Sequence, residues 1–545
     1  MQTADPAYGQ HALARLTDYF MSEGIPWSRR LWDVGSILAL EELCEAGVWQ
    51  PRKVIAPSAM DWQRHELKRL VGPDLGMGDG DLRRELIQLL SRSDLAEPGP
   101  GHRRLRQITE HARVGYLDRW VAALQAGKAV KPERLARTLA SHLLDLGYTP
   151  TYLATNWVRV LRSERADAVA IAESAAAIAR ESPKYFEVLL ALDTIPKRAD
   201  AESSPGWMHK AEVNDWLRSN GHADEAGVRS GGAFVYSVEA RDPYSAAEKV
   251  RRIYERLVAR SLFIRKDRGG LKALPYLWVA DHSEVLPLEG KARSADVLAL
   301  SHMGHLYTVS GEPSTIDDAL ELAAPVNQAA PGPAVAGAWA AVESLLTNPG
   351  DPVSDDERSG KAVAADRLAA IVACSWPRAE LTTLIHRHKP TLPDALVRAR
   401  EGLPTNRERA RAILEEIKAN GVGNLRFVGA TRYSDMAAAE RMRDCIAEPK
   451  RVIGEVTKAI QIALRRLYRA RNLVLHGGST SSVVLDAALR TAAPLVGAGL
   501  DRIAHHFYES QMSPLDLAAR AELSASLVDG DSGLSLVDLL QRPGV

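Results

Sequence analysis

The 545-residue sequence lacks the features that mark several large classes of protein. Its three cysteines, Cys44, Cys374 and Cys445, lie far apart, are odd in number and form no CxxC pair. This excludes a disulfide framework and a cysteine-based zinc site, and it is typical of a protein in a reducing cytoplasm. No run approaches the roughly 18–20 unbroken apolar residues of a membrane-spanning helix. The most apolar windows, at 168–179 and 334–346, are short, and each contains a glutamate.

Charge and the absence of certain motifs exclude further classes of function. The chain has 69 Lys+Arg and 69 Asp+Glu, so its net charge is zero and any basic surface must be local. It contains no GxxxxGK[ST] sequence, which excludes a nucleotide-binding loop of the P-loop type. The polar N-terminus, which includes Asp5, does not resemble a secretory signal. We therefore expect a cytoplasmic protein with no membrane attachment and no cofactor.

Length and composition predict a multidomain, mainly α protein. The sequence is 46% hydrophobic and 25% charged, as in ordinary globular proteins, and its length corresponds to roughly two to four domains. The predicted parts are an N-terminal helical region (1–182), which could sense a signal or contact nucleic acid, a small α/β domain (183–310), a C-terminal helical bundle (311–511) with an insertion near 378–450, and a C-terminal tail (512–545).

Periodicity places the individual elements. Apolar residues at intervals of three and four predict helices at 27–47, 59–71, 81–90, 103–124, 132–146, 151–161, 166–179, 244–260, 334–346, 362–376, 406–420, 435–446, 449–476 and 481–507. Runs rich in aromatic and β-branched residues predict strands at 185–192, 234–240, 262–265 and 276–280. Glycine, proline and aspartate predict a turn at 267–270 and breaks at 348–360 and 390–404.

The segment 465–478, RRLYRARNLVLHGG, carries the strongest chemical signal. An apolar stripe with alternating spacings of four and three predicts that 449–476 is a core helix. Arg471 lies at the edge of this stripe, whereas Asn472 and His476 lie one turn apart on the opposite flank. The glycines at 477 and 478 cannot easily prolong the helix.

Arginine, asparagine and histidine in this arrangement suit RNA cleavage by internal transesterification. His476 can take the proton of the 2′-hydroxyl or give one to the leaving 5′-oxygen, because histidine titrates near neutral pH. Arg471 can bind the phosphate and stabilise the extra charge of the transition state. Asn472 can fix the imidazole tautomer or bind a phosphate oxygen. The chemistry needs no metal, but both acid and base are required, so we expect a second copy of the chain to complete the site.

The sequence RNLVLH resembles the R-x4–6-H motif of HEPN domains, in which a polar residue follows the arginine. Residues 339–346, WAAVESLL, resemble the first long helix of the ApeA-like branch of these domains. The match covers about 331–510, and its insertion near 378–450 is longer than expected. The expected catalytic residues are then Arg471, Asn472 and His476. The expected supporting residues are Glu343, Tyr468 and Gly477, and the expected RNA-binding residues are Arg465, Arg466 and Arg469. No metal ligand is expected.

The resemblance implies a HEPN-like helical bundle that dimerises and cleaves RNA without a metal ion. It also implies a regulated toxin or antiviral, abortive-infection effector that acts on an RNA substrate as a homodimer or higher homo-oligomer. A phage-derived or host trigger would release it, and residues 1–310 would sense this trigger or restrain the nuclease.

Two alternatives stay open. Arg471 could pair with a carboxylate such as Glu343 or Asp366, with His476 merely capping the helix. The domain could also be a dimerising regulatory protein of HEPN fold that binds nucleic acid, nucleotides or partners without catalysis.

A second basic segment lies in the N-terminal region. Residues 103–137 contain nine Lys/Arg and three acidic residues, interleaved with Tyr116 and Trp120. This pattern is compatible with nucleic-acid contact, although a solvated helix face is the commoner explanation.

Two pairs of histidines, at 302 and 305 and at 386 and 388, invite a metal interpretation. Neither pair has a Cys, Asp or Glu at the spacing that would complete a tetrahedral set. We expect histidines of loops or of the surface.

Overall fold

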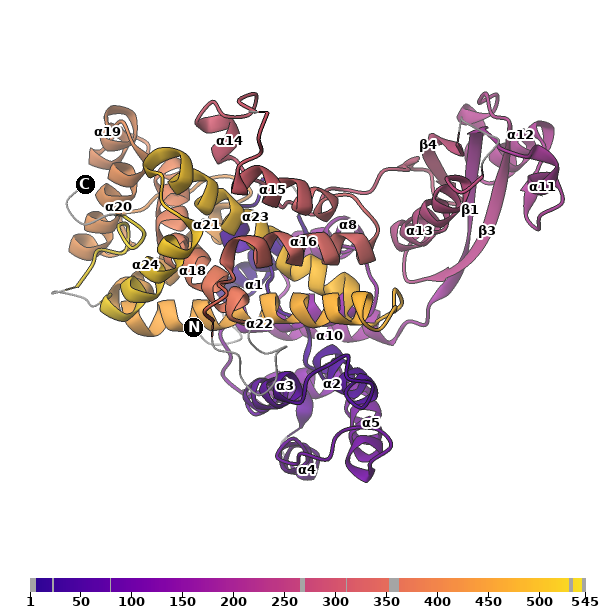
Figure 1. Ribbon diagram of the computed structural model, residues 1–545. Coiled ribbons are helices and arrows are strands. Elements are labelled where there is room, and N and C mark those ends of the chain that lie inside the picture. Colours follow the sequence, from indigo (N-terminus) through magenta and orange to yellow (C-terminus); the bar gives the residue numbers. More distant parts are fainter. Residues whose placement is uncertain are drawn as a thin grey trace. The chain divides into compact units, whose positions relative to one another are not determined.

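The computed structural model describes residues 6–21, 24–78, 80–264, 270–309, 311–351, 362–528 and 533–541 (Figure 1). Helices dominate these residues, and the strands among them form one five-stranded sheet. The chain is mainly α with a small α/β region, which confirms the fold class predicted from the sequence.

The chain divides into two compact units. One comprises Met1–His142, Leu161–Ser174 and Arg293–Val545, and the other comprises Leu143–Val160 and Ala175–Ala292. The second unit contains most of the predicted α/β domain together with parts of the preceding helices. The first unit differs from the predicted division, because the N-terminal helical region and the C-terminal bundle share one set of internal contacts.

The second unit is an antiparallel sheet with a helix on each face. Its elements are α8 (Pro150–Tyr152), the π-helix Leu153–Val158, β1 (Lys184–Thr194), α11 (Arg198–Glu202), β2 (Trp207–Met208), α12 (Lys210–Ser219), the 3-10 turn Ala223–Glu225, β3 (Gly232–Ala240), α13 (Pro243–Ser261), β4 (Lys272–Val279) and β5 (Leu286–Pro287). The strand order is β2-β3-β1-β4-β5. In the central strand, Leu190 pairs with Phe234 of β3 and Leu277 of β4. Because neighbouring strand residues point to opposite faces, Leu190 packs with α13 and Leu189 with α12.

The strands predicted at 185–192, 234–240 and 276–280 are confirmed as β1, β3 and β4, with limits that differ from the predicted ones by up to four residues. The strand predicted at 262–265 is wrong. Leu262 closes the last turn of α13, and Phe263 follows in a turn with 88% of its surface exposed. A short apolar run directly after a helix does not by its composition distinguish the helix end from a strand. Arg265 and most of the turn predicted at 267–270 lie outside the described residues.

The first unit is built from helices around one apolar core. The helices within it or extending from it are α1 (Pro6–Phe20), α2 (Ser36–Trp49), α3 (Pro57–Val71), α4 (Asp81–Leu89), α5 (Pro100–Arg113), α6 (Tyr116–Gln125), α7 (Pro132–Asp145), α9 (Arg159–Glu164), α10 (Ala168–Arg180), α14 (Ala299–His302), α15 (Thr315–Ala323), α16 (Pro331–Leu346), α18 (Ala362–Arg387), α19 (Ala395–Gly402), α20 (Asn406–Asn420), α21 (Arg432–Ala447), α22 (Pro449–Leu475), α23 (Leu485–Ser510) and α24 (Pro514–Leu527). Three 3-10 turns join them, Trp27–Arg29, Leu75–Met77 and Ala324–Val326. Buried residues of α16, α18, α22, α23 and α24 belong to one cluster, and Figure 1 shows α16 and α22 side by side.

Helix α18 is a long and largely buried helix of this core. It continues through Pro377 to Arg387, beyond the end predicted at 376. Among the described residues it is the one helix long and apolar enough to cross a membrane. However, 78% of its most apolar window is buried inside the protein, which fits the core helix of a soluble protein.

Several predicted helix limits change. The helix predicted at 27–47 begins only at Ser36, after the 3-10 turn Trp27–Arg29. The helix predicted at 103–124 is two helices, because Gly115 between them adopts a left-handed φ of 66°. The break predicted at 390–404 contains α19, and residues 352–360 of the other predicted break lie outside the described part of the chain.

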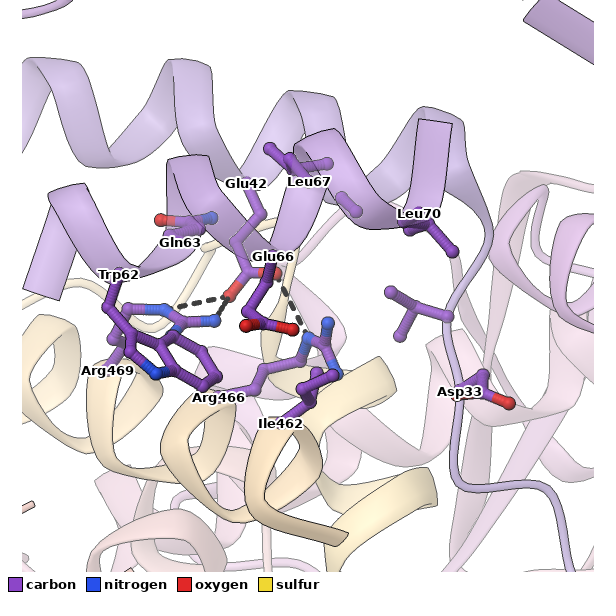
Figure 2. Close-up of a pocket in the computed structure, with 12 residues that line it drawn as sticks. Asp33, Glu42, Trp62, Gln63, Glu66, Leu67, Leu70, Ile462, Arg466 and Arg469 are labelled. Carbon is purple, nitrogen blue, oxygen red and sulfur yellow. Dashed lines mark hydrogen bonds and ion pairs between the residues drawn. The ribbon is translucent and has the colours of Figure 1, made fainter. Parts of the chain in front are cut away.

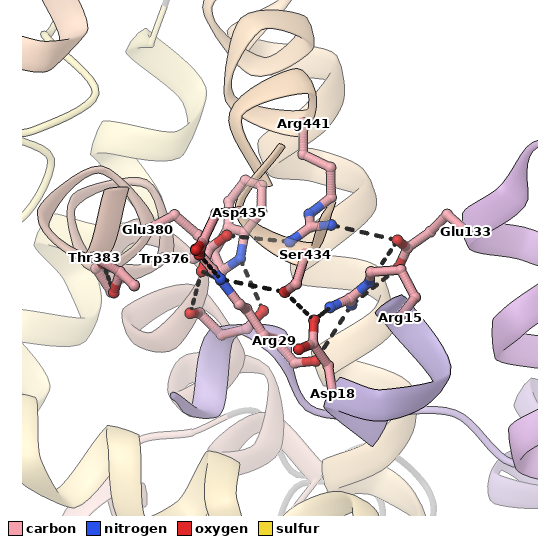
Figure 3. Close-up of polar contacts among 12 residues, drawn as sticks. Arg15, Asp18, Arg29, Glu133, Trp376, Glu380, Thr383, Ser434, Asp435 and Arg441 are labelled. Carbon is pink, nitrogen blue, oxygen red and sulfur yellow. Dashed lines mark hydrogen bonds and ion pairs between the residues drawn. The ribbon is translucent and has the colours of Figure 1, made fainter. Parts of the chain in front are cut away.

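A buried network of ion pairs joins the N-terminal helices to the bundle (Figure 3). Arg29 donates to Glu380 of α18 at 3.2 Å and to Asp435 of α21 at 2.6 Å. These three side chains are at most 3% exposed. Arg441 of α21 reaches Glu380 at 3.2 Å and Glu133 of α7 at 3.3 Å. Charges this deeply buried are stable only when paired, so the network fixes how these helices meet.

The same contacts keep the carboxylates ionised. Burial alone would raise the pKa of Glu380, but Arg29 and Arg441 lower it below its usual value. Burial likewise opposes ionisation of Glu133, and Arg15 and Arg441 hold its pKa well below the usual range. A carboxyl group whose pKa is lowered on folding stabilises the fold above its unfolded pKa, and this contribution disappears as the pH falls through the folded value.

We predict that Glu380→Gln lowers the free energy of unfolding by about 3–5 kcal/mol at pH 7, because Arg29 and Arg441 each lose one of their two carboxylate partners in a buried network. Below pH about 4.3, the usual pKa of glutamate, the wild-type protein should lose stability and approach the variant. Thermal melting from pH 7 to pH 3.5 measures both effects. The control is Glu85→Gln in the exposed pair with Arg104, which should cost less than about 1 kcal/mol. A gap between wild type and Glu380→Gln that stays constant across this range would contradict the prediction.

Candidate active site at the C-terminal end of helix α22

Helix α22 positions the predicted catalytic residues near its C-terminus. Pro449 begins the helix, where its missing N–H is not needed, and the predicted apolar stripe faces the core through Ile460 and Leu467. The helix ends at Leu475, with His476 as its C-cap. The backbone N–H of His476 donates to the Asn472 carbonyl at 2.9 Å, so the chain leaves the helix at the residue that carries the imidazole.

The structure brings Arg471, Asn472 and His476 into contact. Nη1 of Arg471 donates to Oδ1 of Asn472 at 3.1 Å and lies 3.0 Å from Nε2 of His476. A guanidinium group can only donate, so in this contact Nε2 must carry a lone pair and the ring proton sits on Nδ1. Asn472 is 5% exposed, whereas His476 is exposed at the surface. A rigid amide and guanidinium therefore present the basic nitrogen of an accessible imidazole.

Helix α16 supplies the predicted supporting carboxylate. Oε2 of Glu343 lies 3.8 Å from Nη2 of Arg471 and accepts a hydrogen bond from Nε1 of Trp339 at 2.9 Å. The Trp339 ring packs against Tyr468 of α22, with ring centroids 4.7 Å apart. One of the alternative partners considered for Arg471 is thus present. Arg471 contacts His476 at the same time, so the ion pair with Glu343 leaves the guanidinium beside the imidazole.

The three arginines predicted to bind RNA are paired within the chain. Arg465 donates to both carboxylate oxygens of Asp366, at 2.9 and 2.5 Å, so Asp366 is a partner of Arg465 and not of Arg471. Arg466 and Arg469 are each 4% exposed, and both bind Glu42 of α2 (Figure 2). In this conformation their guanidinium groups are not presented to solvent.

Glu42 is the participant that the sequence did not reveal. Its Oε2 accepts from Arg466 at 3.0 Å, and its Oε1 accepts from Arg469 at 3.1 and 2.5 Å. Burial alone would raise its pKa, but the two arginines lower it, so the carboxylate is charged. The available signal was the pair of glutamates, Glu41 and Glu42, in the largely apolar sequence SILALEEL of a mostly buried helix.

The basic segment 103–137 does not offer the predicted interleaved aromatic side chains. Tyr116 and Trp120 are 2% and 0% exposed, and both donate to Asp74, at 2.8 and 2.9 Å. They belong to the N-terminal core and cannot stack on bases. Arg137 of the same segment pairs with Asp33 at 3.1 Å.

His388 lies in the loop that follows α18, as expected for a loop or surface histidine, although it is 1% exposed. Its Nδ1 accepts from the backbone N–H of Arg426 at 3.0 Å, so its Nε2 donates to Asp394 at 2.7 Å. His305 stacks on Tyr508, with ring centroids 4.0 Å apart. These contacts give both histidines structural partners.

Gly477 follows the candidate histidine, His476, at a position where a side chain does not fit. A Cβ atom at this position would lie 2.6 Å from the Leu473 carbonyl oxygen and 3.1 Å from the Trp49 ring. Gly477→Ala should therefore destabilise the protein by about 1–3 kcal/mol through overpacking. The matched control is Gly454→Ala inside helix α22, where nothing lies within 4 Å and alanine should stabilise by about 0.5–1 kcal/mol. Chemical denaturation measures both, and equal effects of the two variants would refute the steric explanation.

No family model, curated protein or solved structure matches the chain. The candidate site therefore stands on its motif and on the contacts of its own residues.

Proposed function

We propose that the chain is a metal-independent endoribonuclease of the HEPN type. The observation that carries this proposal is that Nη1 of Arg471 reaches both Asn472 and Nε2 of His476, at 3.1 and 3.0 Å. The contact joins a phosphate-binding group to a basic nitrogen at an accessible helix end. It also agrees with the resemblance of RNLVLH to the HEPN motif.

In the proposed reaction the RNA supplies its own nucleophile. Nε2 of His476 takes the proton of a 2′-hydroxyl, whose oxygen attacks the adjacent phosphorus. Arg471 turns from His476 to the phosphate and stabilises the charge of the pentacoordinate transition state. The bond from phosphorus to the 5′-oxygen breaks, and this oxygen receives a proton. The products are a 2′,3′-cyclic phosphate and a 5′-hydroxyl end.

One histidine cannot fill both roles in a single step, so we propose that two copies of α22 face each other in a homodimer. The imidazole of one copy then acts as base, and that of the other protonates the leaving oxygen. Within each copy, Glu343 holds Arg471 in place. We propose that the protein is cytoplasmic and acts as a regulated toxin or antiviral effector, with a phage-derived or host trigger.

His476→Ala should abolish RNA cleavage, a loss of at least about 100-fold for one acid–base group, and EDTA should leave the wild-type rate unchanged. The matched control is His386→Ala, because His386 is an exposed histidine at the end of α18, and it should retain full activity. Gel analysis of RNA fragments, with identification of the cyclic phosphate ends, measures the outcome. Loss of wild-type activity in chelator that a divalent ion restores would exclude the mechanism. Binding without cleavage would favour the non-catalytic regulatory alternative.

Mixing two inactive chains tests the composite site. Homodimers of Arg471→Ala lack both arginines and homodimers of His476→Ala lack both histidines, so each should be inactive. A heterodimer keeps one arginine and one histidine in the shared site. With this histidine as base and water in place of the second histidine as proton donor, we expect a small part of the activity to return. Native mass spectrometry confirms that heterodimers form, and heterodimers as inactive as either parent would count against a shared site.

A further inference from the structure

One face of α22 carries a row of polar groups that leads to the candidate site. Lys458, Arg465, Arg469, Asn472 and His476 are spaced seven, four, three and four residues apart, which places them on one side of the helix. We call these five residues the basic face. From the first arginine to the histidine it extends about 16 Å at 1.5 Å per residue. A row of cations that ends at a cleavage site suits the backbone of single-stranded RNA.

Helix α3 covers the beginning of the basic face. Oε1 of Glu66 lies 2.6 Å from Nζ of Lys458. The indole of Trp62 lies under three cations: its ring centroid is 4.6 Å from the Arg465 guanidinium, 5.5 Å from Nζ of Lys458 and 5.8 Å from the Arg469 guanidinium. In a complex with single-stranded RNA, phosphates and bases would contact the cations of such a face. Here the carboxylate of Glu66 and the ring of Trp62 contact them instead.

Helix α2 continues this cover toward the candidate site. Glu42 binds Arg469 and its neighbour Arg466. One turn later, Glu45 accepts a hydrogen bond from Ser482 at 2.7 Å. At the end of α2 the Trp49 ring lies against Gly477, the residue after His476. The contacts of α2 therefore extend from the arginines to the end of α22.

The contact between α3 and α22 contains a cavity and buried polar atoms without hydrogen-bond partners among the described residues. It contains a cavity of about 60 Å³ lined by Glu42, Trp62, Gln63 and Arg466, among others (Figure 2). Gln63 is 4% exposed, and neither amide atom of its side chain has a hydrogen-bond partner among the described residues. Nη1 of Arg466 is likewise buried and unpartnered. A second cavity, of about 250 Å³, adjoins Trp62 and is lined by Tyr468.

These features distinguish this contact from ordinary packing. Buried polar atoms without partners weaken an interface, and two cavities beside one tryptophan leave room for the ring to move. The single carboxylate of Glu42 serves two guanidinium groups and still leaves Nη1 of Arg466 without an acceptor. A phosphate group offers more acceptor oxygens to the same pair.

We propose that α2 and α3 are an internal mimic of an RNA strand, in which Glu42, Trp62 and Glu66 occupy the surface that binds the phosphates and bases of single-stranded RNA. The inference rests on the proposed function and adds its regulation. Cleavage requires α2 and α3 to leave the basic face, and RNA competes with them for it. The N-terminal region then restrains the nuclease by direct occupation of the substrate surface.

The test measures RNA binding separately from cleavage. In a His476→Ala background, a fluorescent single-stranded 12-nucleotide RNA is titrated into the full chain and into the same chain with Glu42→Gln and Glu66→Gln. Uncovering the basic face should raise the affinity at least about tenfold and steepen its dependence on salt, because more cations then contact phosphates. The matched control is Glu41→Gln, the neighbouring residue on α2, which pairs with Arg113. It removes one negative charge, against two in the double variant, and should leave the affinity unchanged.

Trp62→Ala is a second, independent variant that tests the inference if the carboxylate variant does not fold. It removes no charge and empties the space between the two cavities. It should raise the affinity in the same direction. Hydrogen exchange in the His476→Ala chain should show faster exchange of residues 57–71 when RNA is added. Unchanged affinity in a folded variant of either kind, or slower exchange of 57–71 with RNA, would overturn the inference. Tighter binding by variants that retain His476 but do not cleave would overturn only the proposed nuclease function.

Discussion

Buried carboxylates held between guanidinium groups determine the arrangement of the first unit. Glu380 is 0% exposed and binds Arg29 and Arg441, and Glu42 is 4% exposed and binds Arg466 and Arg469. An ion pair of this kind adds little net stability compared with apolar packing, but removing one partner is costly. The N-terminal helices therefore have one favourable position on the bundle. The access of solvent to α22 depends on that position.

What could be predicted from the sequence is what local spacing encodes. The helix 449–476, its apolar stripe and its glycine ending follow from residues within one helix, and the contact among Arg471, Asn472 and His476 spans only six residues. The helices expected at 59–71 and 406–420 agree with α3 and α20 to within two residues for the same reason. The role of Glu343 beside Trp339 could also be predicted from the sequence, because the two residues are one helical turn apart.

What could not be predicted depends on partners far away in the chain. The sequence indicates that Arg465, Arg466 and Arg469 form a basic cluster, but not that Asp366 and Glu42 neutralise it. Tyr116 and Trp120 resemble a stacking surface until Asp74, more than 40 residues away, is seen to bind both. Burial of a polar residue is a property of the tertiary fold, and neither its charge nor its neighbours in sequence report it.

The pairing of Glu42 with Arg466 joins residues 424 positions apart, and this separation has a consequence for synthesis. At roughly 5–20 residues per second, α2 leaves the ribosome on the order of 20–80 s before α22. The N-terminal helices thus have time to form before the strongly basic helix emerges. The acidic partner is synthesised first, so the basic helix α22 meets its own carboxylates while it is still tethered beside ribosomal RNA.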